Sequence, residues 1–380
     1  MLDLKVDLKA DLRLRLDRVQ GALRENGFDG LTIYYGGQHN MLRMDQIAYL
    51  TDYRTVGPAV LIVPLAGVPE LIMAPTWDAE RAGETAAEVR VTAVTPDQLL
   101  ATAAAAAKNV PGRMALAGRP VMPIGAYDEF THAFAGELLD GEKIVLTVGA
   151  TRTPGELERI EHAASIADLG FAALRETVRV GMREYELAAE VEAAMHAAGA
   201  EDNFGLIAAG SHNIAIRPPT DRKLEEGDVI IGEITPCYRG YLAQLCRTFV
   251  LGEPTDEQLT TYDMLLSALE DGMKAAKPGL PSAGIAHAIN GVIGGAGYEE
   301  YCKPPYMRTR GHGLGLGGVV PYDITDRDGP TLERNMTMVI HPNQYIPSVG
   351  YMMCGDTVVI EEDGPRALTK TPLKLYWHEA

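Results

Sequence analysis

The chain has 380 residues, a formal net charge of -18, and 46% apolar but only 6% aromatic residues. That length and apolar content suffice for two domains with buried cores. No basic patch interrupts the acidic balance, and nucleic acids and anionic membranes repel an acidic protein. We therefore expect neither nucleic acid nor membrane as a partner.

The four cysteines are scattered and form no CxxC motif, and a chain of this length does not need disulfides for stability. A reducing, cytoplasmic location is the default expectation. The N-terminal run MLDLKVDLKADLRLRLDRVQ mixes charges with leucines throughout and lacks an apolar segment. We expect neither a secretion signal nor a membrane anchor there, and no run reaches the apolar length of a spanning helix.

The first part of the chain alternates helical and strand-like patterns. Residues 9–27 carry leucines at helical spacing and end at Gly27, which predicts an amphipathic helix. The runs GLTIYY, AYLTDY, AVLIVPL and PELIMA are β-rich and separated by Gly, Pro and Asp, which predicts strands. Alanine-rich segments that begin near Asp78 and at Ala101 are predicted helices. Residues 1–150 are therefore a predicted small α/β domain.

Near residue 150 the pattern changes to longer helical periods. Pro154 introduces the first of them, with Glu156 in its first turn, and MREYELAAEVEAAMHAAGA follows as a second helix. After an apolar hairpin, two further helical runs repeat the plan. The pattern predicts two similar halves that pair helices with antiparallel strands. The site would lie between these halves, in a second domain over residues 151–380.

The hairpin is the run GDVIIGEITPCYRGYLAQLCRTFVLG, two apolar strands joined by a turn. Glu233 lies inside the first strand, where a carboxylate is costly unless it is paired or protonated. Gln244 and Cys246 alternate with Leu245 and so share one face of the second strand. For Cys246 a core thiol is the preferred interpretation. A nucleophilic thiol is the alternative, if a histidine lowers its pKa.

Two histidines stand in unusual contexts. His312 lies between two glycines in GHGLGLGG, where missing side chains let its ring face a ligand. His341 follows the apolar run TMVI, where an unpaired polar group costs about 1–3 kcal/mol. A core histidine bonded to the backbone is the alternative for each. The residues expected to converge are Glu233, Gln244, His312, His341 and Asp356.

These segments resemble the creatinase, Xaa-Pro aminopeptidase and methionine aminopeptidase (M24) superfamily. The matching parts are the hairpin, GHGLGLG, MTMVIHP and CGDTVVIEEDG, with DQIAYLTDY in the N-terminal part. The resemblance implies an α+β fold, with a pita-bread catalytic domain and a smaller creatinase- or prolidase-like N-terminal domain. It also implies a homodimer, in which Arg54 of one subunit reaches the site of its partner.

The sequence departs from the metal-dependent members of that superfamily. Their five ligand positions, occupied by Asp, Asp, His, Glu and Glu, fall here on Glu233, Gln244, His312, His341 and Gly355. Only His312 is kept. A pair of hard divalent ions needs several anionic oxygens, so we do not expect a dinuclear centre.

Other departures concern the substrate. Val319 and Val320 replace the His-Glu pair that peptidase members place before a proline. Arg217 falls within a residue of a substrate-contacting histidine of the relatives, and nearby His212 either offers a replacement imidazole or caps a loop. Arg308 lies near the position where creatinase-like enzymes bind the substrate's carboxylate through an arginine. A surface location is the alternative for each arginine.

The leading hypothesis is a metal-independent, creatinase-like hydrolase that cleaves a C–N bond in a small, carboxylate-bearing, non-peptide substrate. His312 and His341 would act as general acid and base, while Glu233 orients one of them or activates water. Arg308 and Arg217 would anchor the acidic group. The other expected substrate-binding residues are His212, Gln244, Cys246 and Arg54.

Two alternatives stay open. In the first, Glu233, His312 and His341, with Gln244 as a fourth ligand, hold one Zn, Fe or Mn ion. The enzyme is then an Xaa-Pro peptidase-like hydrolase or a lyase. In the second, the chain is a binding protein that has kept the fold without catalysis. The leading hypothesis favours no cofactor.

Overall fold

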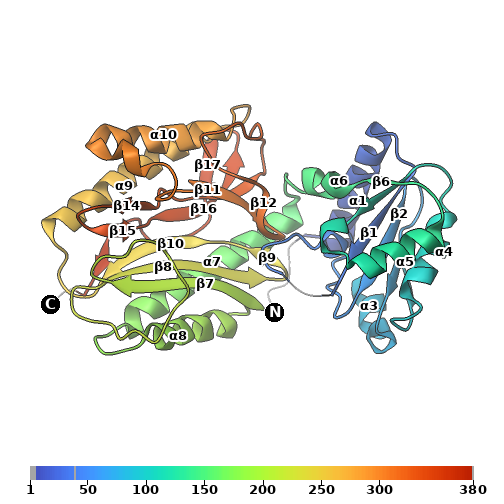
Figure 1. Cartoon of the computed structure of the whole chain (residues 1–380), viewed down its shortest axis with the longest axis horizontal. Coiled ribbons are helices and arrows are strands. Elements are labelled where there is room, and N and C mark those ends of the chain that lie inside the picture. Colours follow the sequence, from blue (N-terminus) through green and yellow to red (C-terminus); the bar gives the residue numbers. More distant parts are fainter. Residues whose placement is uncertain (1–5, 38–39, 379–380) are drawn as a thin grey trace. The chain divides into compact units, whose positions relative to one another are not determined.

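The computed structural model describes residues 6–37 and 40–378. The chain divides into two compact units, Met1–Gly155 and Glu156–Ala380, and the boundary lies a few residues beyond the change of sequence pattern near residue 150. Figure 1 shows the helices and strands of both units.

The described residues of the first unit form a six-stranded mixed sheet in the order β4-β3-β2-β1-β5-β6. Strand β1 runs antiparallel to β2 and parallel to β5. The strands are β1 Gly30–Tyr35, β2 Ala59–Pro64, β3 Glu70–Met73, β4 Arg90–Ala93, β5 Met114–Ala117 and β6 Leu138–Asp140. The helices are α1 Leu8–Glu25, α2 Gln46–Thr51, α3 Ala79–Thr85, α4 Leu99–Lys108, α5 Ile124–Phe134 and α6 Glu142–Val148, with short helical turns η1 Thr76–Asp78 and η2 Arg119–Val121.

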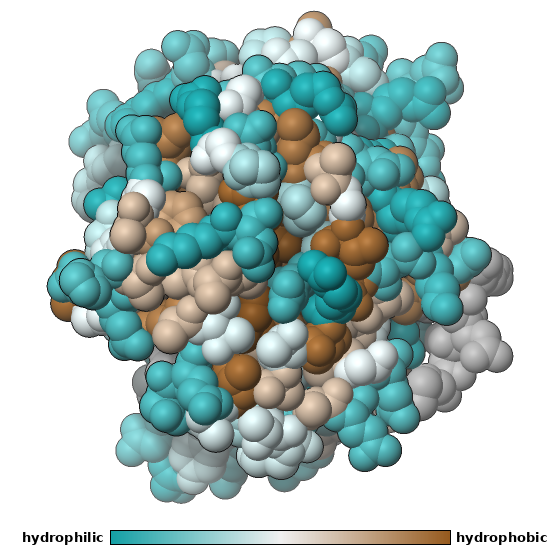
Figure 2. Space-filling model, turned by 90° about the vertical axis from the view of Figure 1, so that its right-hand side faces the viewer, coloured by the Kyte–Doolittle hydropathy of each residue, from teal (hydrophilic) through white to brown (hydrophobic). Residues whose placement is uncertain are grey.

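The core of the first unit lies between its sheet and helices α4 and α5. Ile62 and Ile72 of the sheet pack with Ala103 of α4 and Phe130 of α5. Burial of such side chains contributes about 1.5–3 kcal/mol for each large apolar group. In Figure 2, brown hydrophobic side chains gather near the middle of one face of this unit, among hydrophilic ones. This surface is therefore mixed in polarity.

One predicted strand of the first unit is wrong. The run AYLTDY, residues 48–53, lies largely in helix α2. Asp45 caps this helix, because its side chain accepts a hydrogen bond from the backbone N–H of Ala48. Asp52 ends it in the left-handed conformation, with φ 59°. The capping residues outweigh the β preference of the run between them.

The described part of the second unit forms a ten-stranded sheet, whose main path is β12-β11-β13-β16-β10-β8-β7. Strand β17 pairs with β16, β18 with β10, and β9 with β8, while β14 and β15 form a separate two-stranded sheet. The strands are β7 Asp202–Gly210, β8 Val229–Tyr238, β9 Tyr241–Leu242, β10 Leu245–Val250, β11 Gly311–Gly315, β12 Gly317–Asp323, β13 Thr337–Ile340, β14 Gln344–Ile346, β15 Gly350–Met352, β16 Gly355–Glu361, β17 Gly364–Ala367 and β18 Tyr376–Trp377.

Helices flank this sheet. Helix α8 packs against β7, and α9 packs against β13 and β17 and pairs with α10. The helices are α7 Pro154–Thr177, α8 Glu184–Ala197, α9 Asp256–Ala275 and α10 Ala283–Ile293, followed by the helical turns η3 Gly294–Tyr298 and η4 Glu299–Tyr301. Among the helices of the described ranges, none is both long and apolar enough to cross a membrane.

A buried ion pair fixes the middle of the second sheet. Arg247 of β10 donates from Nη2 to Oδ1 of Asp356 on β16 at 2.7 Å, and their side chains are 0% and 5% exposed. Arg247 Nη1 also donates to the carbonyl oxygens of Cys246 and Gly355. The expectation that Asp356 joins the candidate site is therefore wrong, because Arg247 already holds its carboxylate.

We expect Arg247→Met to lower the free energy of unfolding by about 3–5 kcal/mol, because it leaves a buried carboxylate without its cation. The matched control is Arg366→Met, which removes half-exposed ion pairs with Glu161 and Glu361. The control should cost less than about 1 kcal/mol. Urea denaturation of both variants measures the difference. Equally small losses would contradict this role of the Arg247 ion pair.

Candidate active site

Glu233 lies at the centre of the candidate site, in the fully buried strand β8. It is 9% exposed and stands directly opposite Cys246 of β10 in the antiparallel pairing. Within the described residues, no hydrogen bond or ion pair joins its carboxyl group to another side chain. Burial raises the pKa of Glu233 to about 7, against a small opposing effect of the Arg308 charge. Burial therefore favours the protonated form of this carboxyl group over what a solvated glutamate shows at neutral pH.

His312 and His341 come from neighbouring strands. Strand β11 pairs with β13, and His341 follows directly after β13. The centroids of the two imidazole rings are 5.8 Å apart, and the rings meet edge to face. This part of the prediction rests on two separate motifs, which the sheet places side by side.

Both imidazoles are neutral at neutral pH. Burial lowers the pKa of His312, and burial together with the nearby His312 lowers the pKa of His341 to about 3. His312 Nδ1 lies 3.1 Å from the carbonyl oxygen of Gly313, so it donates there and leaves Nε2 as an acceptor. His341 is 6% exposed, and its Nδ1 has no partner within the described structure.

Arg310 lies behind His341, and sequence reasoning missed it. Its carbonyl oxygen accepts from the backbone N–H of His341 at 3.0 Å. The fully buried guanidinium donates to Asn290 Oδ1 at 2.8 Å, to the carbonyl oxygen of Asn343 at 2.9 Å and to Gln344 Oε1 at 2.8 Å. Arg310 is therefore occupied by neutral acceptors. It holds the segment after His341 in place.

Arg308, which the sequence did predict, is exposed. Its side chain is 72% exposed and donates to Asp323 Oδ2 at 3.3 Å. Asp323 stands opposite His312 in the pairing of β11 with β12. An exposed ion pair of this length contributes little to stability, so the guanidinium of Arg308 can exchange Asp323 for another carboxylate.

Gln244 and Cys246 lie in the same region, as the alternation of the second hairpin strand predicts. Gln244 Nε2 donates to Cys246 Sγ at 3.4 Å, and its backbone N–H donates to Thr357 Oγ1 at 2.7 Å. Cys246 is fully buried, and burial raises the pKa of its thiol well above the usual value. The thiol therefore stays protonated, which argues against a nucleophilic role.

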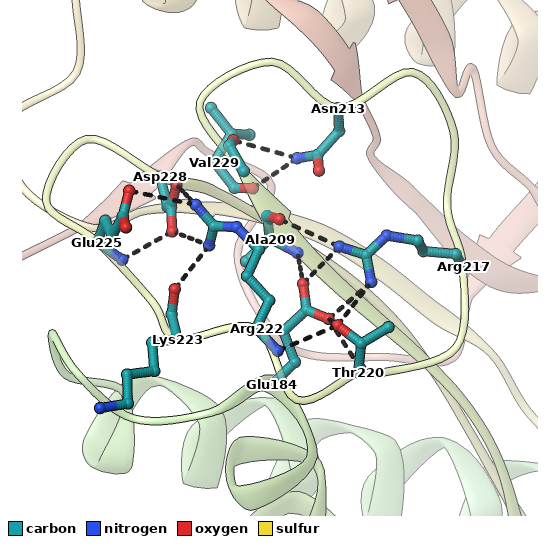
Figure 3. Close-up of polar contacts among 11 residues, drawn as sticks. Glu184, Ala209, Asn213, Arg217, Thr220, Arg222, Lys223, Glu225, Asp228 and Val229 are labelled. Carbon is teal, nitrogen blue, oxygen red and sulfur yellow. Dashed lines mark hydrogen bonds and ion pairs between the residues drawn. The ribbon is translucent and has the colours of Figure 1, made fainter.

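Arg217 lies on the loop between β7 and β8, and its guanidinium is already engaged. It donates from Nη1 and Nη2 to the two carboxylate oxygens of Glu184 at 2.6 and 2.7 Å, as Figure 3 shows. Glu184 is fully buried and also accepts from Thr220. A bidentate pair of this kind is strong and directional. Arg217 therefore anchors the loop.

Two more contacts fix the same loop. Arg222 donates from Nη2 to Asp228 Oδ1 at 2.9 Å, and Asn213 Nδ2 donates to the carbonyl oxygen of Val229 at 2.7 Å (Figure 3). His212, at the start of the loop, is exposed and lies 2.9 Å through Nε2 from the carbonyl oxygen of Pro347. His212 therefore contacts the segment between β14 and β15.

Arg54 belongs to the first unit. Its charge lowers the pKa of Asp45 and of Tyr35. Burial has the larger, opposite effect on both groups and raises the pKa of Asp45 to about 6. Its carbonyl oxygen accepts from Arg81 at 3.0 Å. The reach of Arg54 into a partner's site stays a prediction. The side chains of Val319 and Val320 lie outside the described part of the structure.

The side chains do not fit a pair of metal ions. Gln244 supplies a neutral amide that already donates to Cys246, and Gly355 supplies no side chain. A Cβ atom at Gly355 would lie 2.5 Å from the carbonyl oxygen of Ile340 and 2.6 Å from the Cβ of His341. This backbone therefore has no room for a carboxylate at the fifth ligand position.

A single cation fits the chemistry of the site better. Glu233 is a buried carboxyl group whose pKa burial raises against the Arg308 charge, and the unpartnered Nδ1 of His341 belongs to a neutral imidazole. A carboxylate and two imidazoles are donors that Zn(II) and Fe(II) accept. In the described ranges, no three His, Cys, Asp or Glu side chains stand close enough to hold a metal as they are placed.

Known proteins match both the sequence and the structure. Metallopeptidase family M24 matches residues 158–362. An Xaa-Pro dipeptidase of Pyrococcus furiosus is 33% identical over 237 residues, which cover 62% of this chain and 67% of that protein. A dipeptidase structure from Pyrococcus horikoshii has a TM-score of 0.83 and 26% identity, and the match covers 96% of this chain and 100% of that one. An Xaa-Pro dipeptidase structure from Bacillus anthracis has a TM-score of 0.86 and 22% identity, and the match covers 97% of this chain and 100% of that one.

The predicted superfamily and its α+β pita-bread fold are confirmed.

The comparisons contradict the leading functional hypothesis. The similar proteins are named Xaa-Pro dipeptidases, and the matching family is a metallopeptidase family. The prediction of a metal-independent, creatinase-like hydrolase of a non-peptide substrate is therefore wrong, and the preference for no metal is not supported. The departures from the family's ligand pattern carry no information about the substrate.

The raised pKa of Glu233 predicts a pH-dependent stability. The native state keeps this proton up to about pH 7, whereas an unfolded glutamate loses it near about pH 4.3. Native protein therefore binds more protons between these values, and its stability falls as pH rises through them. The lowered pKa of His341, about 3, acts in the opposite direction below about pH 6.5.

We expect Glu233→Gln to gain stability relative to the wild-type chain by about 2–3 kcal/mol between pH 4 and pH 8. His341 is present in both proteins, so its contribution cancels in the difference. Urea denaturation of chelator-treated protein at several pH values measures this. A stability difference that does not change with pH would show that Glu233 titrates normally.

Proposed function

Because the chain belongs to metallopeptidase family M24, we propose that it is a hydrolase that cleaves the C–N bond of a dipeptide-sized substrate, with one divalent cation. The observation that carries this proposal is the buried carboxyl group of Glu233, whose pKa burial raises to about 7, in the same sheet as two neighbouring neutral imidazoles. The names of the relatives support an Xaa-Pro dipeptide as the first substrate to test.

Glu233, His312 and His341 would hold the cation, with the side-chain oxygen of Gln244 as a fourth ligand. When bound, such an ion supplies Lewis acidity to a carbonyl oxygen and acidity to a water molecule. The neutral imidazoles need lose no proton to bind it, whereas Glu233 must be ionised. Arg308 would leave Asp323 and bind the carboxylate of the substrate.

Anchored side chains surround this set. Arg217, Arg247 and Arg310 are each held by partners within the protein. These arginines therefore orient backbone segments, and Arg308 is left as the exposed cation of the site. The contrast between three anchored arginines and one exposed arginine supports a site that binds one small acidic substrate.

The proposal predicts about one tightly bound divalent ion per chain, and it predicts that the chain releases proline from Ala-Pro. Elemental mass spectrometry before and after dialysis against a chelator measures the bound metal. Chromatography measures the released proline. Glu233→Gln and His341→Ala should each weaken metal binding at least roughly tenfold, because even groups behind metal ligands are worth about 10–100-fold.

The matched control is His287→Ala. His287 is an exposed histidine of α10 that lies 3.1 Å through Nε2 from the carbonyl oxygen of Asp326, and its removal should change neither quantity. Two ions per chain would contradict the single-ion site. A chain that binds none of Zn, Fe and Mn, and releases no proline when they are supplied, would overturn the proposed function.

A further inference from the structure

A small pocket, the C-terminal pocket, lies near the end of the second unit. It has a volume of about 270 Å³ and is lined by Arg175, Phe249, Lys374, Leu375, Tyr376, Trp377 and His378. Within the described chain, its lining includes none of the candidate-site residues. Strand β18 pairs in parallel with β10 there, with Tyr376 opposite Phe249. Ligand sites start at about 300 Å³, so this pocket suits a small molecule.

The segment that carries Tyr376 is fixed by the protein itself. Tyr376 is 4% exposed, and its hydroxyl group donates to the carbonyl oxygen of Pro372 at 2.8 Å. The buried Arg247 donates from Nη2 to the carbonyl oxygen of Thr371 at 2.6 Å. The backbone N–H of Thr371 donates to Asp168 of α7 at 2.8 Å. The wall of the pocket is therefore formed without a ligand.

Two positive charges lie over the ring of Tyr376. The guanidinium carbon of Arg175 is 4.9 Å from the ring centroid, and Nζ of Lys374 is 5.2 Å from it. Among the described residues, neither side chain forms an ion pair with a carboxylate. The chain as a whole has a net charge of -18. Two neighbouring cations without carboxylates therefore make this pocket a local site of attraction for an anion.

Aromatic groups make up much of the remaining wall. Phe249 meets the imidazole of His378 edge to face, with ring centroids 5.1 Å apart. His378 Nε2 lies 3.0 Å from the carbonyl oxygen of Val178, and Trp377 is partly exposed. A flat ring stacks favourably on aromatic side chains. The pocket thus combines a cationic part with an aromatic part.

An adjoining pocket has the opposite charge balance. The two pockets share Trp377 and His378. The charged residues of the adjoining pocket are Arg179, Glu226 and Glu253. Its carboxyl groups outnumber its one arginine, so an anion is favoured in the C-terminal pocket.

We propose that the C-terminal pocket binds a small anion that carries a flat ring. Arg175 and Lys374 bind the anionic group, and Trp377 stacks on the ring. Nucleoside monophosphates and aromatic carboxylates share this chemistry. The inference goes beyond the proposed function and does not depend on it, because binding in this pocket uses neither the metal nor Glu233.

The test uses two pairs of probes that differ by an anionic group: AMP with adenosine, and phenylacetate with phenylacetamide. Calorimetry on the full-length chain at low ionic strength measures their dissociation constants. We expect at least one anion to bind about tenfold more tightly than its neutral counterpart, which is the range of one hydrogen bond to a charged group. The pair that shows this preference distinguishes a phosphate ligand from a carboxylate ligand.

The double variant Arg175→Met/Lys374→Met should lower this preference to less than about threefold, because both cations are lost. Both side chains are exposed, so we expect the variant to fold, which thermal melting verifies. The matched control is Lys108→Met, which removes an exposed lysine from the end of α4 in the first unit. The control should keep the full preference.

Fluorescence locates the bound anion. The chain has two tryptophans, and Trp77 is 74% exposed in the first unit. Trp77→Phe therefore leaves Trp377 as the single source of tryptophan emission. We expect the preferred anion to change this emission with the dissociation constant that calorimetry gives.

Equal binding of anions and neutral probes would overturn the inference, as would a preference that survives in the folded double variant. Unchanged emission of Trp377 on binding would also contradict it. Inorganic phosphate and acetate test the role of the ring. If they bind as tightly as the anions that carry a ring, the pocket holds an adventitious ion only, and the inference is wrong.

Discussion

The candidate site depends on one carboxyl group that the fold buries, with the charge of the exposed Arg308 opposing the effect of burial. Glu233 is in strand β8, whose residues are all buried between β10 and β7, and Arg217 and Arg247 are held by other carboxylates. Removing a carboxylate from water costs several kcal/mol unless a cation accompanies it. The protein meets this cost by keeping a proton on Glu233, whose pKa rises to about 7, and a bound cation would replace that proton.

The residues near Glu233 limit which cation can replace its proton. Gln244 donates its amide to Cys246, and Gly355 lies so close to Ile340 and His341 that even one added carbon would clash. The site therefore retains one carboxylate and two imidazoles. These three donors suit one divalent ion.

Much of the fold could be predicted, because the informative patterns are local. The apolar hairpin, the helices after Pro154 and Thr255, and the two histidine motifs all carry their signal within a few residues. The run AYLTDY predicts a strand from its own composition, whereas Asp45, just outside the run, caps a helix over Gln46–Thr51. The chemistry of His312 and His341 was accessible because glycines and a proline flank them.

The parts that could not be predicted depend on contacts between distant residues. Arg217 is paired with Glu184 and Arg247 with Asp356, across 33 and 109 positions of the chain. Arg310 reaches the site only through the pairing of strands. The family match was found from the sequence, but the activity inferred from it was wrong. That inference came from the missing ligands, and absent groups do not specify a substrate.

The most direct test of this account is the titration of Glu233 itself. NMR spectra of the chelator-treated chain, labelled with ¹³C at the glutamate carboxyl carbons, would follow every glutamate as pH changes, and Glu233→Gln would identify the signal of interest. The account predicts that this carboxyl group titrates at about pH 7. A midpoint near about pH 4.3, the value of a solvated glutamate, would show that Glu233 is neither desolvated nor in need of a cation.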